Sequence, residues 1–189
     1  MSRLDIIAGP NGAGKTTLFE RVIEPDRPGL PFVNPDRIAS QRWPGEELAY
    51  SSEAAKIAAA TRSQLIDARL DFCTETVFSH ESKLELVVDA NAAGYDVVLH
   101  VVMIPLELSG PRVKSRVGSG GHAVPNEKLA GRYLRLWPLI AAATGHCRRV
   151  VFYDNSHDDG PVEVASCRSG TFDYPPRWPD WTPDALTAL

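Results

Sequence analysis

Residues 3–16 read RLDIIAGPNGAGKT, and this stretch decides the fold. Its first six residues, RLDIIA, form a short apolar run typical of a buried strand. The next eight, GPNGAGKT, match the pattern G-x-x-x-x-G-K-[ST] at every fixed position. From average residue usage, a chain of this length contains the pattern by chance in roughly one case in a hundred. Because the motif follows a strand and opens a helix, it predicts a loop that binds nucleotide phosphates.

The residue types of this loop suit phosphate binding. Glycines let the backbone curl so that successive N–H groups point at one phosphate, and the helix N-terminus adds partial positive charge. Lys15 is expected to reach the β- and γ-phosphates and to take part in catalysis, and the Thr16 hydroxyl is expected to coordinate Mg²⁺. The alternative is a glycine turn with an incidental lysine. The predicted binding residues for ATP are Gly9, Pro10, Asn11, Gly12, Ala13, Gly14, Lys15, Thr16 and Thr17.

The rest of the chain alternates between strand and helix patterns. Apolar runs predict strands at 3–8, 32–33, 70–74, 96–104 and 149–153, and an edge strand at 162–165. Helical patterns occupy 16–24, 46–70, 79–93 and 125–143; Ser79 suits an N-cap and Gly94 a helix stop. This alternation predicts an α/β fold of the P-loop NTPase type. We expect a doubly wound, mainly parallel sheet of about five strands, with helices on both faces and an arginine-containing lid.

Two segments depart from this alternation. Residues 106–124 are richer in Arg, Gly and Ser, and they are predicted to form an interrupted helix and a flexible loop that act as the lid. Residues 170–189 are rich in Pro and Trp, and we expect this tail to lie on the surface as an extended clamp. No linker is long enough to divide the chain, so residues 1–189 are interpreted as one domain.

Composition narrows the classes of partner. The formal net charge is −4 without a long block of Lys and Arg, which argues against duplex nucleic acid. No apolar stretch approaches the length of a membrane span, and the first residues lack the apolar run of a secretory signal. Cys73, Cys147 and Cys167 are odd in number and lack metal-ligand spacing. We therefore expect reduced thiols in a cytoplasmic protein that has no membrane partner.

Carboxylates follow two of the predicted strands, at the edge where the phosphate loop lies. Asp36 follows the second strand, and Glu75 and Thr76 close the third. Because ligands of open α/β sheets bind at the carboxyl ends of the strands, these residues are expected to contact a phosphoryl acceptor. Asp36 suits the base that takes the proton of the acceptor hydroxyl; the alternative is a cap of the helix that starts near Arg37. Glu75 suits an acceptor hydroxyl or a magnesium-bound water, with a structural hydrogen bond as the alternative.

The segment 106–135 supplies a cluster of cations. Arg112 and Arg116 are four residues apart, so a helix places them on one face. A lid over a nucleotide needs such groups to neutralise the phosphoryl in transfer. Arg116 is the first candidate for this contact and Arg132 the second; the alternative is a solvated basic helix face. The other basic residues nearby are Lys114, His122, Lys128 and Arg135.

Several segments, in this order, resemble the zeta-toxin family of P-loop kinases. They are GPNGAGKTT at 9–17, FVNPDRIA at 32–39, FCTETVFS at 72–79 and VVMIP at 101–105, followed by an arginine-containing lid. GGHAVP at 120–125 and the helix with RYLRLWPLI at 132–140 are similar to the shorter bacterial members. The resemblance covers residues 3 to about 156, and the NPD and TET elements are more specific than the phosphate loop alone.

The resemblance implies a kinase that transfers the γ-phosphate of ATP to a hydroxyl of a sugar nucleotide, with UDP-N-acetylglucosamine as the leading acceptor. It implies Asp36 as the catalytic base, Glu75 as an acceptor-binding carboxylate and Arg116 as a lid arginine that stabilises phosphate. An antitoxin protein that blocks the ATP site is implied as a partner. The chain departs from the family at Asn34, where the family has an acidic residue, and at 120–122, where Gly-Gly-His replaces a second lid arginine.

Three other functions compete with this interpretation. The acceptor could be another small metabolite or a nucleoside, and the chain would remain a kinase. A P-loop ATPase or switch that acts through a protein partner predicts slow hydrolysis with no acceptor dependence. A kinase of nucleic-acid ends needs a basic groove, against which the net charge of −4 counts. Two carboxylates at strand ends and an arginine-containing lid favour the small-molecule kinase.

Overall fold

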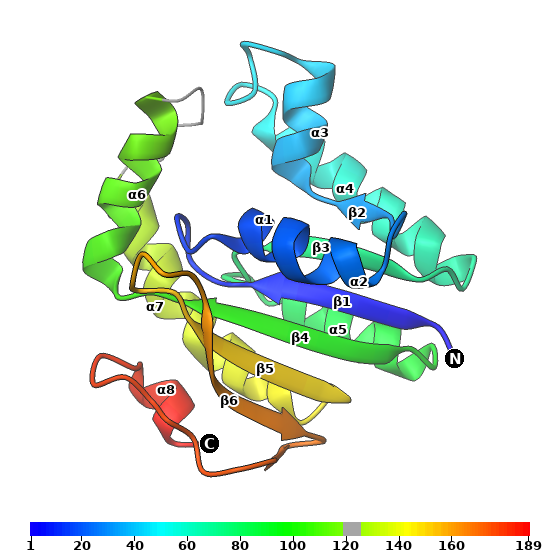
Figure 1. Cartoon of the computed structure of the whole chain (residues 1–189). Helices are drawn as coiled ribbons and strands as arrows, with labels where there is room; N and C mark the ends of the chain where they lie inside the picture. The colour runs from blue at the N-terminus through cyan, green and yellow to red at the C-terminus, as the bar shows by residue number, and fades with distance from the viewer. Residues whose placement is uncertain (119–125) are drawn as a thin grey trace.

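The central element is one twisted sheet, shown in Figure 1. A computed structural model describes residues 1–118 and 126–189, with the side chains of 116–118 and 126–128 outside the description. In the described part of the chain the sheet has seven strands in the order β2-β3-β1-β4-β5-β6-β7. The strands are β1 (Arg3–Ala8), β2 (Phe32–Val33), β3 (Phe72–Thr76), β4 (Asp96–Met103), β5 (Arg149–Asp154), β6 (Val162–Arg168) and β7 (Thr171–Phe172).

The first five strands are parallel, which confirms the predicted sheet. β1 pairs with both β3 and β4, β2 pairs with β3, and β5 pairs with β4. β6 and β7 then add in antiparallel order. The predicted edge strand at 162–165 is confirmed as the first part of β6, which extends to Arg168; the two-residue strand β7 pairs only with Cys167 and Arg168.

Helices cover both faces of the sheet, as predicted. Successive residues of β1 alternate between the two cores: Ile6 belongs to the larger core and Ile7 to the smaller. The larger core lies under α4 (Ser51–Asp67), α5 (Ser82–Ala92), α7 (Asn126–Thr144) and α8 (Asp184–Thr187). The smaller core lies under α1 (Lys15–Leu18), the π-helix η1 (Phe19–Ile23), α2 (Glu24–Asp26) and α6 (Leu106–Gly118).

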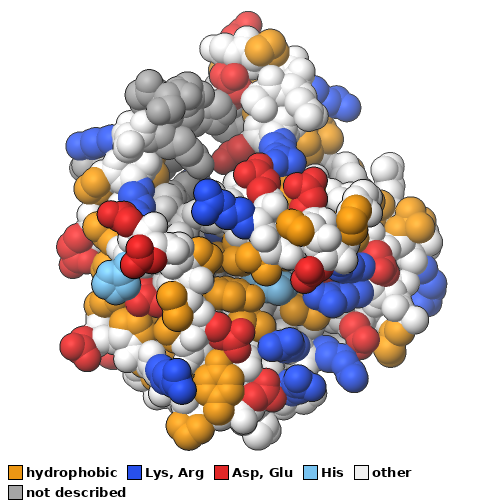
Figure 2. All heavy atoms as spheres, in the orientation of Figure 1, with side chains coloured by type: hydrophobic (Ala, Val, Ile, Leu, Met, Phe, Trp, Pro, Cys, Tyr) orange, Lys and Arg blue, Asp and Glu red, His pale blue; other side chains and the backbone are white. Residues whose placement is uncertain are grey.

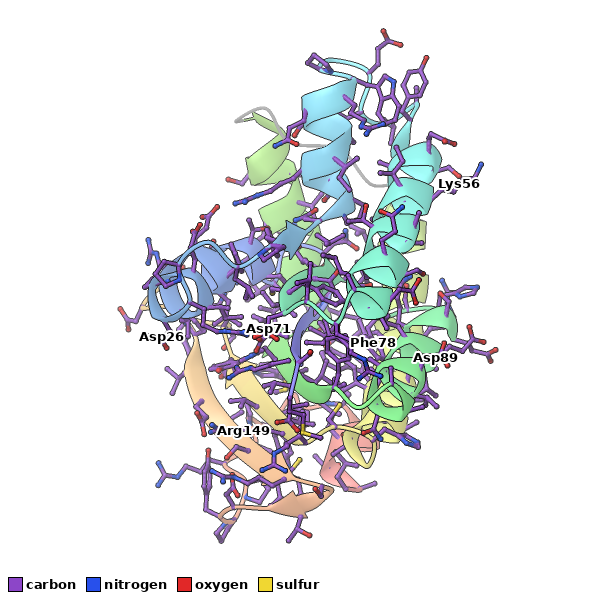
Figure 3. The ribbon with its side chains drawn as sticks, turned by 90° about the vertical axis from the view of Figure 1, so that its right-hand side faces the viewer. Asp26, Lys56, Asp71, Phe78, Asp89 and Arg149 are labelled. Carbon is purple, nitrogen blue, oxygen red and sulfur yellow. The ribbon has the colours of Figure 1, made fainter. Side chains whose placement is uncertain are left out.

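Helix α5 begins three residues later than the sequence predicted. Ser79 was predicted as its N-cap, which is wrong: the helix begins at Ser82, and its N-cap Glu81 makes no side-chain capping bond. The cause is Phe78, whose φ of 64° places a bulky residue in the left-handed region and turns the chain sharply after β3. The ring of Phe78 lies in the core that α4 and α5 cover (Figure 3). Gly94 ends the element as predicted, with φ 84°.

The predicted lid and tail segments differ from the structure, and the role of residues 106–124 as a lid stays a prediction. Residues 106–118 form the continuous helix α6 despite Pro111 in its interior, and the predicted flexible loop lies in 119–125, outside the described residues. The tail is more than an extended surface clamp. Trp178 packs edge-on against Phe152 of β5, with ring centroids 5.2 Å apart, and Leu186 of α8 is fully buried. The tail therefore covers apolar surface that β5 presents on the side of α7.

A polar network lies in the amino-terminal half of the parallel strands. Asp5 of β1 is fully buried; its Oδ1 accepts from Arg3 Nη2 at 2.6 Å and lies 3.1 Å from His100 Nε2, and its Oδ2 accepts from Arg27. Arg27, just after α2, also donates to Asp71, which Figure 3 labels. Burial opposes ionisation of Asp5, but the bonds from His100 and Arg3 outweigh it and hold its pKa below the usual value. We call these residues the Asp5 network.

Within the described residues, no helix combines the length and the apolar character needed to cross a membrane.

Candidate active site

The phosphate-binding loop, residues 9–16, joins β1 to α1. Gly14 has φ 87°, in the left-handed region that favours glycine, and a Cβ there would lie 2.6 Å from Nδ2 of Asn155. Gly9 passes so close to the backbone of β4 that a Cβ would overlap the carbonyl oxygen of Val102. Two of the glycines in the motif are therefore required by the conformation of the loop.

Lys15 and Thr16 meet Glu75 at the carboxyl ends of β1 and β3. Parallel pairing sets Ile7 opposite Glu75, so the loop after β1 passes beside the end of β3. Lys15 Nζ is buried, donates to the carbonyl of Pro10 at 3.0 Å and lies 3.7 Å from Glu75 Oε1. Thr16 Oγ1 donates to Glu75 Oε2 at 2.7 Å. Glu75 thus faces the two side chains that are expected to hold phosphate and Mg²⁺.

Asn34 and Asp36 lie at the start of α3 (Pro35–Arg42). Asn34 is the N-cap, because its Oδ1 accepts from the backbone N–H of Asp36 at 2.7 Å and of Arg37 at 3.3 Å. The alternative interpretation of Asp36 as the helix cap is therefore wrong. Asp36 is exposed on the first turn of α3, a place that leaves its carboxylate accessible to an acceptor. Its role as a base stays a prediction.

Thr76 is engaged in the turn after β3. Its Oγ1 accepts from the backbone N–H of Phe78 at 3.1 Å, and Thr76 pairs with Ala8 in the sheet. The hydroxyl therefore helps to shape the loop beside Glu75. Its predicted contact with an acceptor stays a prediction.

Among the residues that the structure describes, one thiol lies near these groups, and burial raises its pKa. Cys73 lies in β3, two residues before Glu75, and is fully buried. Burial first, and then the carboxylates of Asp5 and Glu75, raise the pKa of the Cys73 thiol. A neutral thiol is a poor nucleophile, so Cys73 is a core residue. Cys147 and Cys167 are also buried and free, as expected for reduced thiols.

Three residues that support the phosphate-binding loop were missed or misassigned from the sequence. Ser109 of α6 donates to the carbonyl of Asn11 at 2.7 Å, and Asn155 after β5 donates to that of Ala13 at 2.8 Å. Arg112 donates to the carbonyls of Asn155 and Ser156 at 2.7 and 3.3 Å, so it braces this turn. The one available sequence signal was Asn155 itself, a polar residue directly after a buried strand.

The remaining lid cations are only partly described. The side chains of Arg116 and Lys128 and all of His122 lie outside the described residues, so Arg116 stays a prediction. Arg132 is half-buried on α7, while Lys114 is exposed on α6. Arg135 is exposed and its Nε lies 3.4 Å from the carbonyl of Ser79, beyond a strong hydrogen bond. On the face seen in Figure 2, acidic and basic side chains are interspersed, unlike a surface that tracks duplex nucleic acid.

Comparison with known proteins agrees with the arrangement of this site. The sequence model of the family described as zeta toxin matches residues 3–165. The chain belongs to the zeta-toxin family. The match includes the phosphate-binding loop, α3 with Asp36, β3 with Glu75, and α6. It also includes residues 119–125, outside the described part of the chain.

Solved structures of other proteins share the fold of this chain. The AvrRxo1-ORF1:AvrRxo1-ORF2 complex with ATP aligns with a TM-score of 0.71 and 19% identity, over 92% of this chain and 60% of the matched chain. The toxin–antitoxin system PezAT of Streptococcus pneumoniae aligns with a TM-score of 0.66 and 17% identity, over 88% of this chain and 72% of the matched chain. The chain thus spans 60% of the length of the AvrRxo1-ORF1:AvrRxo1-ORF2 match.

One relative was found by sequence comparison. An uncharacterised protein of Haemophilus influenzae is 29% identical over 126 residues, which cover 66% of this chain and 88% of that protein.

Proposed function

We propose that this protein is an ATP-dependent kinase that transfers the γ-phosphate to a hydroxyl of a small molecule. The observation that carries the proposal is the junction of Lys15, Thr16 and Glu75 beside α3. A site that only binds nucleotide needs only the loop and its lysine. Here the exposed carboxylate of Asp36 lies nearby, because the side chain of Asn34 hydrogen-bonds both to the backbone of Asp36 and to Glu75. That pairing is what phosphoryl transfer to a hydroxyl needs.

ATP and Mg²⁺ fit the groups that are present. The loop backbone and Lys15 would hold the phosphates, and the Thr16 hydroxyl with Glu75 forms an oxygen donor pair, 2.7 Å apart, of the kind that Mg²⁺ prefers. Held there by these two residues, a magnesium ion would supply positive charge beside the phosphates. Of the roles predicted for Glu75, this contact favours a magnesium-bound water over an acceptor hydroxyl.

Asp36 is the proposed base. Its place on the first turn of α3 leaves the carboxylate accessible, and the cap of the helix is supplied by Asn34. Asp36 would orient the acceptor hydroxyl and accept its proton as the oxygen attacks the γ-phosphate. Arg116, from α6, would stabilise the phosphoryl in transfer, with Arg132 as a further contact.

The acceptor proposed is a sugar nucleotide, with UDP-N-acetylglucosamine first. Membership of the zeta-toxin family supports it; another small metabolite or a nucleoside is the alternative. A cognate antitoxin is the proposed protein partner, since the PezAT match is named as a toxin–antitoxin system. Residues 1–189 would act as one kinase domain in the cytoplasm, with α6 as part of the lid.

The test is ATP consumption against a panel of hydroxyl acceptors headed by UDP-N-acetylglucosamine. Asp36→Asn should keep ATP binding and lower turnover on the order of a hundredfold. Asp89→Asn is the matched control, because Asp89 is exposed on α5, away from the site (Figure 3). Stimulation by another acceptor would replace the sugar nucleotide. Slow hydrolysis that no acceptor changes would overturn the kinase in favour of a switch.

A further inference from the structure

Asn34 joins the acceptor side of the site to the nucleotide side. It lies between β2 and α3, and its side chain is buried, with 4% exposed. Its Oδ1 caps α3 by accepting from the N–H of Asp36 and of Arg37. Its Nδ2 donates to Glu75 Oε2 at 2.8 Å. Since the same Glu75 oxygen accepts from Thr16 at 2.7 Å, a short chain of hydrogen bonds runs from the backbone of Asp36 to the phosphate-binding loop.

The neighbours of Asn34 fix the orientation of its amide. Two backbone N–H groups at the start of α3 require an acceptor, so the oxygen must point at them. The Glu75 carboxylate requires a donor, so the NH₂ group must point the other way. A flipped amide would place its NH₂ group against the backbone N–H groups and its oxygen against the Glu75 carboxylate, so both contacts would be lost. Capping alone would be satisfied equally well by Asp or Ser, whereas the second contact needs an amide.

We propose that Asn34 is a positioning residue that uses both ends of its amide to hold Asp36 in register with Glu75 and Thr16. The proposal rests on the kinase function above, because it explains how the base of that reaction is placed. A displacement of about 1 Å of a reacting group costs up to a hundredfold in rate, so the register of α3 matters for turnover.

The decisive variant is Asn34→Asp. Aspartate keeps the oxygen that caps α3 but places a second carboxylate against Glu75, where Asn34 donated. We expect the melting temperature at pH 8 to fall by roughly 5 °C, because two like charges then share a buried site. At saturating ATP and acceptor, we expect kcat to fall about tenfold or more, because α3 and Asp36 move away from Glu75. Asn91→Asp, at an exposed asparagine in the last turn of α5, is the matched control; it should leave kcat unchanged and lower the melting temperature less than Asn34→Asp, because its new charge opposes only the helix dipole.

A reciprocal exchange tests the contact itself. In the double variant Asn34→Asp with Glu75→Gln, the amide stands at position 75 and can donate to the aspartate at 34. We expect the double variant to recover at least half of the melting-temperature loss of Asn34→Asp. This readout needs neither nucleotide nor acceptor, so it stays informative if the enzyme uses a different substrate.

The outcomes separate the two proposals. Wild-type stability and kcat in Asn34→Asp would show that Asn34 is only a helix cap and overturn the inference. A lower melting temperature with unchanged kcat would also overturn it, since the contact would then position nothing. If the wild-type protein phosphorylates no acceptor, the proposed function fails, while the double variant still decides whether Asn34 holds Glu75.

Discussion

Two networks of polar side chains lie on the same parallel strands, and they differ in how completely their central carboxylate is buried. Asp5 is fully buried and contacts Arg3, Arg27 and His100. Glu75 is 11% exposed and contacts Lys15, Thr16 and Asn34 at the carboxyl ends of the strands. Each network places one carboxylate among hydrogen-bond donors, and at least one of these donors is a cation. Only the second has partners, Lys15 and Thr16, that are suited to bind a ligand.

The difference separates stability from function. The donors around Asp5 lie in the strands and just after α2, outside the phosphate-binding loop, so we expect their contacts to contribute to the stability of the fold. Lys15 and Thr16 contact Glu75, and a bound phosphate and metal would share these contacts. We therefore expect matched substitutions in the two networks to affect different measurements.

The largest expected effect is on stability. Asp5→Asn should lower the free energy of unfolding by about 3 kcal/mol, because it removes the charge that Arg27, Arg3 and His100 share in a buried site. Urea denaturation measures this loss. The turnover of the folded fraction should remain near that of the wild type. A variant with wild-type stability would show that the two networks do not differ in this way.

The matched substitution at the other carboxylate should affect function. Glu75→Gln is expected to lower Mg²⁺-dependent turnover roughly 10–100-fold, as is typical when a group behind a metal ligand is changed. Its unfolding free energy should stay within about 1 kcal/mol of the wild type, since Glu75 lies at the rim of the site. Magnesium titration of ATP consumption measures the first quantity and urea denaturation the second. A stability loss as large as that of Asp5→Asn would contradict the comparison.

The contribution of Asp5 to the free energy of unfolding should disappear gradually as the pH falls. The pKa of Asp5 is lower in the folded protein than its unfolded value of about 3.9. The ionised carboxylate therefore stabilises the fold above that pH, and the contribution is lost as pH falls through the folded pKa. Unfolding free energies measured from pH 6 downward should converge for wild type and Asp5→Asn. A constant difference down to pH 2 would show that ionisation of Asp5 is not the cause.

The smallest effect is expected at the outer side of α3. Arg37 pairs with Glu20 at 2.6 Å and lies 4.8 Å over the ring of Phe32, yet 41% of its side chain is exposed. Arg37→Met should therefore cost at most about 1 kcal/mol of unfolding free energy. Because Asn34 caps α3 independently, kcat should change less than in Asn34→Asp. If Arg37→Met lowered kcat more than Asn34→Asp, Arg37 and not Asn34 would be the residue that positions α3.

The sequence could predict the parts of the fold and site that depend on local pattern. Lys15 and Thr16 follow from the loop motif, and Glu75 follows from the rule that parallel strands end at one edge. Asp36 and Asn34 were harder to separate, because both residue types cap helices and only the structure shows which side chain turns back onto the backbone. The contact of Asn155 with Ala13 joins residues 142 positions apart, and no local pattern encodes such a contact. The start of α5 was misplaced because the positive φ of Phe78 contradicts its residue type.

The π-helix η1 has a consequence for how this chain tolerates change in length. A π turn carries one residue more than an α turn, so Phe19–Ile23 is equivalent to a one-residue insertion into an ordinary helix. In an unbroken α-helix, one inserted residue would rotate everything after it by about 100°. Because η1 absorbs the extra residue locally, Lys15 and Thr16 before it and Arg27 after it keep their directions toward Glu75 and Asp5. Deletion of one residue within Phe19–Ile23 is thus expected to convert η1 into an ordinary α turn while both networks keep their geometry.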